Sequence, residues 1–140
     1  ADMAKDYGVK LAWENVHWCW YAEPDFPEKL MPHITSDNLY FTLDVKQAAQ
    51  AGHDPSDYIA PVKGRLVNVH LCDFEHSATK GIIPRLPFEG ELDIVRFRRD
   101  LQQAGYNGGV ILEVYSHNYK DLPQLQRCYE RVADCFSKPL

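Results

Sequence analysis

The sequence predicts an α/β fold with a parallel sheet, because strand-like and helix-like segments alternate along the chain. Four short apolar segments have the length of buried strands, and helical stretches separate them. Each of the four ends on an acid or a histidine; they are Val9–Glu14, Leu39–Asp44, Leu66–His70 and Val110–Glu113. The carboxyl ends of parallel strands lie at one edge of a sheet, where ligands bind. We therefore expect the four end residues to share one site.

Turn and capping residues mark the elements of the first half of the chain. Residues 1–7 resemble the end of a helix that Gly8 closes. Further helices are expected near residues 26–33 and over residues 45–51, after the first and second strands. Asp54, followed by proline and serine, is expected to start another helix that runs to about residue 62.

The second half combines one long connection with two longer helices. Residues 72–92 contain several prolines and glycines and are expected to form a long loop. Asp93 is expected to cap a helix that runs to about Ala104, where Gly105 stops it. After the fourth strand, residues 121–136 are expected to form the closing helix.

Four β/α units form an incomplete fold. An open sheet of this size would have helices over one face and nothing over the other, whereas a complete (β/α)8 barrel takes about 250 residues. The chain also begins on the end of a helix, without the strand that should precede it. We therefore expect residues 1–140 to be one partial domain, the C-terminal half of a (β/α)8 TIM barrel. Its exposed strand edges predict a homodimer of half-barrels or association with a missing N-terminal half.

Composition and charge argue against several classes of protein. The net charge of −5 and the pI of about 5.6 disfavour a nucleic-acid-binding or anionic-membrane surface. No apolar run approaches the roughly 20 residues needed to span a bilayer. The four cysteines form no CxxC pair, which favours a reduced, cytoplasmic protein.

The strand-end residues form a donor set for one divalent metal ion. Three carboxylates, from Glu14, Asp44 and Glu113, and the imidazole of His70 are a mainly hard set of ligands. Mn²⁺ is the first expectation, and Mg²⁺, Co²⁺ or Zn²⁺ suit the same ligands. Taken singly, Asp44 is as well explained as a helix cap and His70 as a core histidine. Taken together, the four favour a metal site.

Five segments resemble, in this order, the second half of the xylose isomerase-like TIM barrels: GVKLAWENV, LYFTLDVKQAAQAGHDP, GRLVNVHLCDF, GELDIVRF and GYNGGVILEVYS. That superfamily includes sugar phosphate isomerases and epimerases, ketose 3-epimerases, inosose dehydratases and apurinic-site endonucleases (AP endonuclease family 2). The resemblance implies that Glu14 and Glu113 hold the metal and act as acid and base, with Asp44 and His70 as the other two ligands. It implies isomerisation or epimerisation of a sugar or sugar phosphate through an enediolate; dehydration of a 2-keto sugar is closely related.

Residues near the strand ends are candidates for substrate binding. Lys46 and Gln47 are expected to hydrogen-bond substrate hydroxyl groups, and His76 or Arg85 to engage a distal hydroxyl or phosphate. The chain also departs from the family, since Phe88 stands where a glycine-any-glycine turn has its first glycine.

Two alternative functions stay open. An AP-endonuclease-like phosphodiesterase would need more zinc ligands, but Gln47 replaces a histidine common in the family, and Asp73 and His76 are wrongly spaced for its Asp-x-His pair. A non-catalytic half-barrel is the other alternative, because the strands that would build the second wall of the site are absent from this chain. The sequence favours the metal-dependent isomerase or epimerase and leaves the sugar and the metal open.

Overall fold

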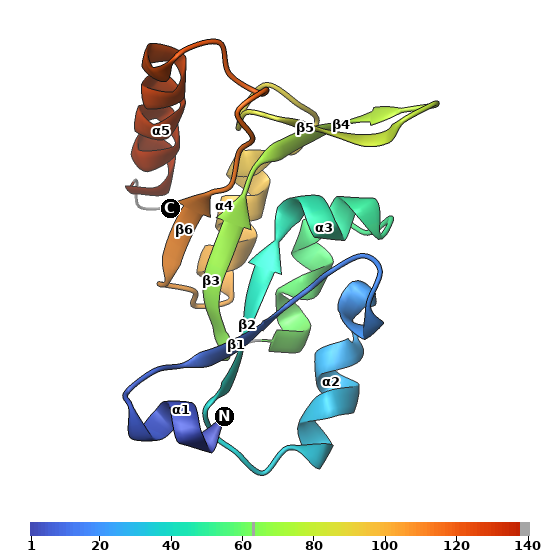
Figure 1. The fold of residues 1–140 in the computed structure, drawn as a ribbon, viewed down its shortest axis with the longest axis vertical. Coiled ribbons are helices and arrows are strands. Elements are labelled where there is room, and N and C mark those ends of the chain that lie inside the picture. Colours follow the sequence, from blue (N-terminus) through green and yellow to red (C-terminus); the bar gives the residue numbers. More distant parts are fainter. Residues whose placement is uncertain (63, 138–140) are drawn as a thin grey trace.

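The computed structural model describes residues 1–62 and 64–137. Within them, four strands form a parallel sheet in the order β1-β2-β3-β6 (Figure 1). The strands are β1 (Leu11–Glu14), β2 (Leu39–Asp44), β3 (Leu66–Leu71) and β6 (Gly109–Leu112). Helical connections join the strands, so the predicted α/β fold with about four parallel units of a partial TIM barrel is confirmed.

The helices lie close to the positions predicted from the turn and capping residues. They are α1 (Asp2–Asp6), α2 (Phe26–Leu30), α3 (Val45–Gln50), α4 (Ile94–Gln103) and α5 (Leu122–Ser137), and a 3-10 turn (Met31–His33) follows α2. Asp93 caps α4 by accepting a hydrogen bond from the Arg96 N–H, and Gly105 has a φ of 78° after the helix ends. Among the described residues, no helix is both long and apolar enough to cross a membrane.

Two predicted elements are wrong in type. The helix expected from Asp54 to about residue 62 is instead two 3-10 turns, Pro55–Tyr58 and Ala60–Val62. Pro61 lacks the N–H group that a continuous α-helix over these residues would need in its interior. The loop expected over residues 72–92 contains an antiparallel hairpin.

The hairpin consists of β4 (Asp73–Ser77) and β5 (Gly81–Arg85), and it projects beyond the carboxyl ends of β2 and β3 (Figure 1). Pro84 is one of the prolines and glycines from which a loop was expected, but it pairs with Phe74 in a two-stranded ribbon. Both strands of such a ribbon are edge strands, which tolerate a proline. The chain turns at Gly81, whose φ is 70°.

The returning segment after the hairpin is fixed by a buried carboxylate. Asp73 accepts hydrogen bonds from the N–H groups of Phe74, Gly90 and Leu92 at 2.8–2.9 Å. A side chain at position 90 would collide with Asp73, which accounts for the glycine. Phe88 has a φ of 70°, in the left-handed region that favours glycine.

The two faces of the four-stranded sheet differ in burial. Side chains on one face, including Phe41, Leu43 and Val69, are fully buried under α3 and α4. On the opposite face Asn68 is half-buried, and Ile111 is 51% exposed. This more exposed face carries the acidic and imidazole groups at the strand ends, because those groups alternate along each strand with the buried side chains of the other face.

Candidate metal centre

The four strand-end residues converge. Ligand atoms of Glu14, Asp44, His70 and Glu113 all lie within 4.8 Å of one another. Glu14 and Asp44 are the last residues of β1 and β2, His70 is the penultimate residue of β3, and Glu113 directly follows β6. The Glu113 N–H donates to the Leu71 carbonyl oxygen at 2.9 Å, which continues the β3–β6 ladder by one residue. The parallel order of the strands thus brings residues up to 99 positions apart into one cluster.

Asp44 combines two roles that the sequence presented as alternatives. Its Oδ1 atom accepts a hydrogen bond from the Gln47 N–H at 2.9 Å and thereby caps α3. Its carboxylate also belongs to the four-residue cluster. Burial raises the pKa of Asp44 to about 6, and the negative charges of Glu113 and Glu14 act in the same direction. A cation in the cluster would favour the ionised form.

His70 presents a nitrogen atom that lacks a satisfactory partner. Its Nδ1 lies 2.6 Å from Oε2 of Glu113 and 3.7 Å from Oε1 of Glu14. This buried Nδ1 nevertheless makes no hydrogen bond of acceptable geometry. The other ring nitrogen, Nε2, lies 3.0 Å from the side-chain amide of Asn68. A metal ion at Nδ1 would need the ring proton on Nε2. The Asn68 side chain, turned so that its Oδ1 faces Nε2, would then accept a hydrogen bond from this N–H.

The donor set also fits a divalent ion by charge. Three carboxylates within one small cluster repel one another unless a cation lies between them. The ammonium group of Lys46 is buried close by, so a divalent ion and this lysine would together balance the three acids. Burial raises the pKa of the neighbouring Cys72 thiol to about 12 in the absence of a metal ion.

The candidate substrate residues Lys46 and Gln47 lie beside the cluster, but both already have partners. Lys46 donates a hydrogen bond to the Tyr115 hydroxyl, and its Nζ lies 4.9 Å from the centre of that ring. Gln47 Oε1 accepts from the His17 N–H at 3.2 Å and lies 2.7 Å from His17 Nδ1. Both residues would have to share or exchange these partners to contact a sugar.

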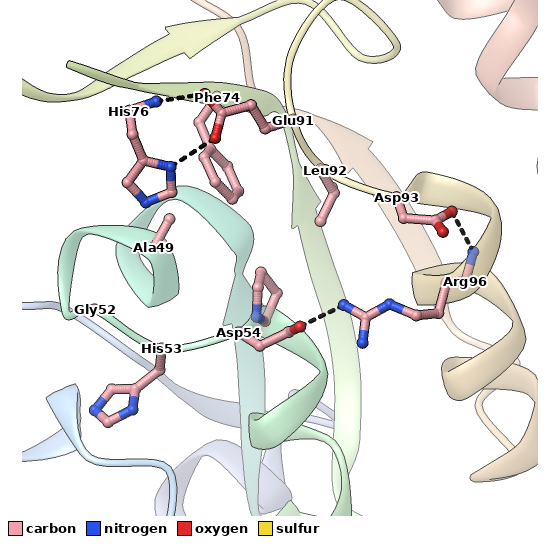
Figure 2. A pocket seen from close by; sticks show the side chains of 11 residues that line it. Ala49, Gly52, His53, Asp54, Phe74, His76, Glu91, Leu92, Asp93 and Arg96 are labelled. Atoms are coloured by element: carbon pink, nitrogen blue, oxygen red, sulfur yellow. Dashed lines mark hydrogen bonds and ion pairs between the residues drawn. The ribbon is translucent and has the colours of Figure 1, made fainter.

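The other two candidates, His76 and Arg85, lie on the hairpin. Arg85 forms an ion pair with Glu75 on the facing strand. His76 lies in a separate pocket of about 370 Å³, where its Nδ1 is 2.7 Å from Oε2 of Glu91 (Figure 2). This pocket shares no residue with the metal-ligand cluster, and Arg96 and Asp54 form an ion pair across it. The structure therefore does not place His76 with the four predicted ligands.

Three residues at the site were not anticipated from the sequence. Asn15 follows Glu14 and is fully buried, Asn68 precedes His70 by two positions, and Tyr115 follows Glu113 by two positions. The spacing of two was an available signal for Asn68, since alternate residues of a strand share a face. Asn15 bonds to Asp44 at the end of β2 and Tyr115 to Lys46 of α3, both far away in the sequence, and no local pattern marks them.

Comparison with known proteins places the chain in a family. The family model described as "Xylose isomerase-like TIM barrel" matches residues 1–135. The chain belongs to this family. No curated protein matches this xylose isomerase-like chain.

Solved structures of this fold support the architecture. The chain is similar to a D-tagatose 3-epimerase-like protein, with a TM-score of 0.73, 20% identity, and coverage of 96% of this chain and 49% of the other. It is similar to the IOLI protein crystallised with zinc, with a TM-score of 0.76, 22% identity, and coverage of 99% and 53%. It is also similar to a Mycobacterium smegmatis xylose isomerase-like protein in complex with magnesium, with a TM-score of 0.72, 19% identity, and coverage of 97% of this chain and 46% of the other. The xylose isomerase-like chain thus spans about half the length of these proteins.

Proposed function

We propose that this chain carries the metal-binding half of a sugar isomerase or epimerase that depends on one divalent metal ion. The observation that supports it most is the convergence of Glu14, Asp44, His70 and Glu113 at the carboxyl edge of the sheet. Family membership supports it as well, and similar structures include a D-tagatose 3-epimerase-like protein and proteins crystallised with zinc or magnesium. Mn²⁺ is the proposed ion, and Mg²⁺, Co²⁺ and Zn²⁺ suit the same ligands.

The proposed chemistry is proton transfer next to a carbonyl group. A divalent ion, when bound, would stabilise the negative charge that develops on the oxygens of a hydroxy-ketone as its α-proton leaves. Glu14 ends β1 and Glu113 directly follows β6, the two outer strands of the sheet, so in the proposal their carboxylates would flank the substrate. In the proposal one of them removes the proton and the other returns one, which accounts for two glutamates at the site.

The remaining residues would orient the substrate. Lys46 lies buried beside the acids and donates to the Tyr115 hydroxyl, so it would present a positive charge to a substrate oxygen. Gln47 would offer its amide from the first turn of α3. His76 and Arg85, on the hairpin, are proposed only for a distal hydroxyl or phosphate. A sugar or sugar phosphate is the proposed substrate class.

Hydrogen exchange tests this function directly. The intact protein, loaded with Mn²⁺ and incubated in D₂O with a panel of ketoses and ketose phosphates, is expected to replace the α-proton of at least one with deuterium, as followed by NMR. Glu14→Gln is expected to slow the exchange by about 10²–10⁴-fold, the usual contribution of a general acid or base. Absence of exchange on every ketose by metal-loaded protein would contradict the proposed reaction.

We further propose that a second half-barrel completes the site, either as a second copy of the chain or as an N-terminal half. The more exposed face of the sheet supports this proposal, because a closed barrel would cover its side chains. The edge strands β1 and β6 support it as well, because each has unpaired main-chain groups that a neighbouring strand would bind. The purified 140-residue chain, if it pairs with itself, is expected to have twice the monomer mass of 16.1 kDa by light scattering. A cooperatively melting monomer would contradict self-pairing.

A further inference from the structure

Asn15 occupies a special place at the end of the β1–β2 ladder. The register of the two strands ends with Glu14 opposite Thr42, after which the chain leaves β1. Beyond this point the Asn15 side chain makes the hydrogen bonds to β2. Its Oδ1 accepts from the Asp44 N–H at 2.7 Å, and its Nδ2 donates to the Asp44 carbonyl oxygen at 3.0 Å. One amide side chain therefore satisfies both main-chain groups of Asp44, as the main chain of a longer β1 would do.

This arrangement couples two of the candidate ligands. Asn15 is bonded to Glu14 along the chain, and it holds the main chain of Asp44 by two hydrogen bonds. Its side chain is completely buried, so no water replaces these bonds if the amide is lost. The Asn15 side chain thus holds the Glu14 and Asp44 main chains together at this edge, alongside the hydrogen bond from the Asn15 N–H to the Thr42 carbonyl oxygen at 3.4 Å.

We propose that Asn15 is a positioning residue for the metal centre, one that sets the spacing between the Glu14 and Asp44 ligands. The inference rests on the proposed metal site and goes beyond it, because it assigns the affinity of that site to a residue outside the ligand set. Partners that orient metal ligands typically change affinity by 10–100-fold when they are lost. A buried asparagine with only a structural role would affect the stability of the fold and leave affinity unchanged.

Asn38 offers a matched control at the opposite end of the same strand pair. It is also a buried asparagine, and its Nδ2 donates to the carbonyl oxygens of Ala1 at 3.0 Å and Val9 at 2.9 Å. It thus holds the chain before β1 against the chain before β2, as Asn15 holds the ends of these strands. Because it lies at the amino ends, Asn38 is far along the strands from Glu14 and Asp44.

The test compares Asn15→Leu with Asn38→Leu; leucine has the same branching as asparagine, although it is larger, and has no hydrogen-bonding atoms. Co²⁺ binding to the chain is measured by calorimetry and by the visible spectrum of the bound ion, and the urea midpoint is measured without metal. Asn15→Leu is expected to weaken Co²⁺ binding by about 10–100-fold and to alter the spectrum. Asn38→Leu is expected to lower the urea midpoint while the Kd for Co²⁺ stays within about twofold of wild type.

Other results of these measurements would contradict the proposed role of Asn15. A Kd within twofold of wild type in Asn15→Leu, or equal weakening in both variants, would overturn the positioning role. If Asn15→Leu does not fold, Asn15→Asp carries the test, because it keeps the acceptor for the Asp44 N–H and loses the donor. It is then expected to weaken binding by at least about tenfold, and an unchanged Kd would overturn the proposal. Wild-type chain that binds no Co²⁺ would overturn the metal site itself, and with it this inference.

Discussion

Replacing Glu113 with glutamine is expected to remove most of the metal affinity of the chain. The substitution keeps the shape of the side chain but removes the charge that lies 2.6 Å from His70 Nδ1. The loss should exceed the 10–100-fold that is typical of partners outside the ligand set, since a ligand itself is changed. Calorimetric titration of wild type and Glu113→Gln with Mn²⁺ and Co²⁺ measures it. The same variant is expected to lose activity by about 10²–10⁴-fold in the intact protein.

Glu91→Gln is the matched control for this prediction. Glu91 also pairs with a histidine, His76, at 2.7 Å, but outside the cluster (Figure 2). Its loss is expected to leave metal affinity unchanged. Equal stoichiometry and affinity in wild type and Glu113→Gln would contradict the assignment of Glu113 as a ligand. A fall of the same size in Glu91→Gln would point to a general effect of lost charge.

Asp44→Asn is expected to stabilise the metal-free chain while it abolishes metal binding. Burial raises the pKa of Asp44 from its ordinary value of 3.8 to about 6, so the ionised carboxylate destabilises the folded chain at neutral pH. The difference corresponds to roughly 3 kcal/mol at 1.36 kcal/mol per pKa unit. Asparagine keeps the Oδ1 atom that accepts from the Gln47 N–H. Urea unfolding without metal at pH 7.5 is expected to show a gain of up to roughly this size.

The raised pKa of Asp44 also predicts how the stability of the metal-free chain changes with pH. The folded chain takes up a proton at Asp44 near pH 6, whereas the unfolded chain does so near pH 4. Between these values the folded state binds more protons, so this group makes the metal-free chain more stable as pH falls from 6 to 4. The increment should vanish in Asp44→Asn. An asparagine variant less stable than wild type at pH 7.5 would contradict the account.

Asp54→Asn is the control, because Asp54 is also a capping aspartate but has the opposite shift. Partial burial raises its pKa, but hydrogen bonds from the Ser56 N–H and the Arg96 side chain outweigh this effect and hold the pKa below its usual range. Asp54→Asn is therefore expected to destabilise the chain at neutral pH. The opposite signs of the two aspartate-to-asparagine changes separate a buried ligand from a surface cap.

The sheet and the four convergent residues were predictable from the sequence, because both depend on local rules. Apolar runs that end on an acid or imidazole predict the strands, and parallel order brings their ends together. The hairpin was not predicted because a proline such as Pro84 is typical of loops, although an edge strand also tolerates proline. The 3-10 turns after Asp54 were missed for a related reason: Pro55 is typical of a helix start, but Pro61 interrupts the helix that would follow.

The supporting residues of the site were beyond sequence reasoning. Asn15 looks like any polar residue after a strand, and its role appears only when the main chain of Asp44, 29 positions away, lies beside it. Likewise, the bond between Lys46 and Tyr115 joins residues 69 positions apart. The Nδ1 atom of His70, without a satisfactory hydrogen bond, depends on the orientation of the ring, which the sequence does not encode locally.

The most direct test of the metal centre is the anomalous scattering of Co²⁺ in crystals of the chain. One peak is expected among the carboxylate oxygens of Glu14, Asp44 and Glu113, about 2.0–2.2 Å from Nδ1 of His70. Asp44 should keep its bond to the Gln47 N–H through Oδ1, so the ion is expected on the other oxygen. A peak elsewhere, or none at saturating Co²⁺ with the four side chains in their present places, would contradict a metal centre at this edge of the sheet.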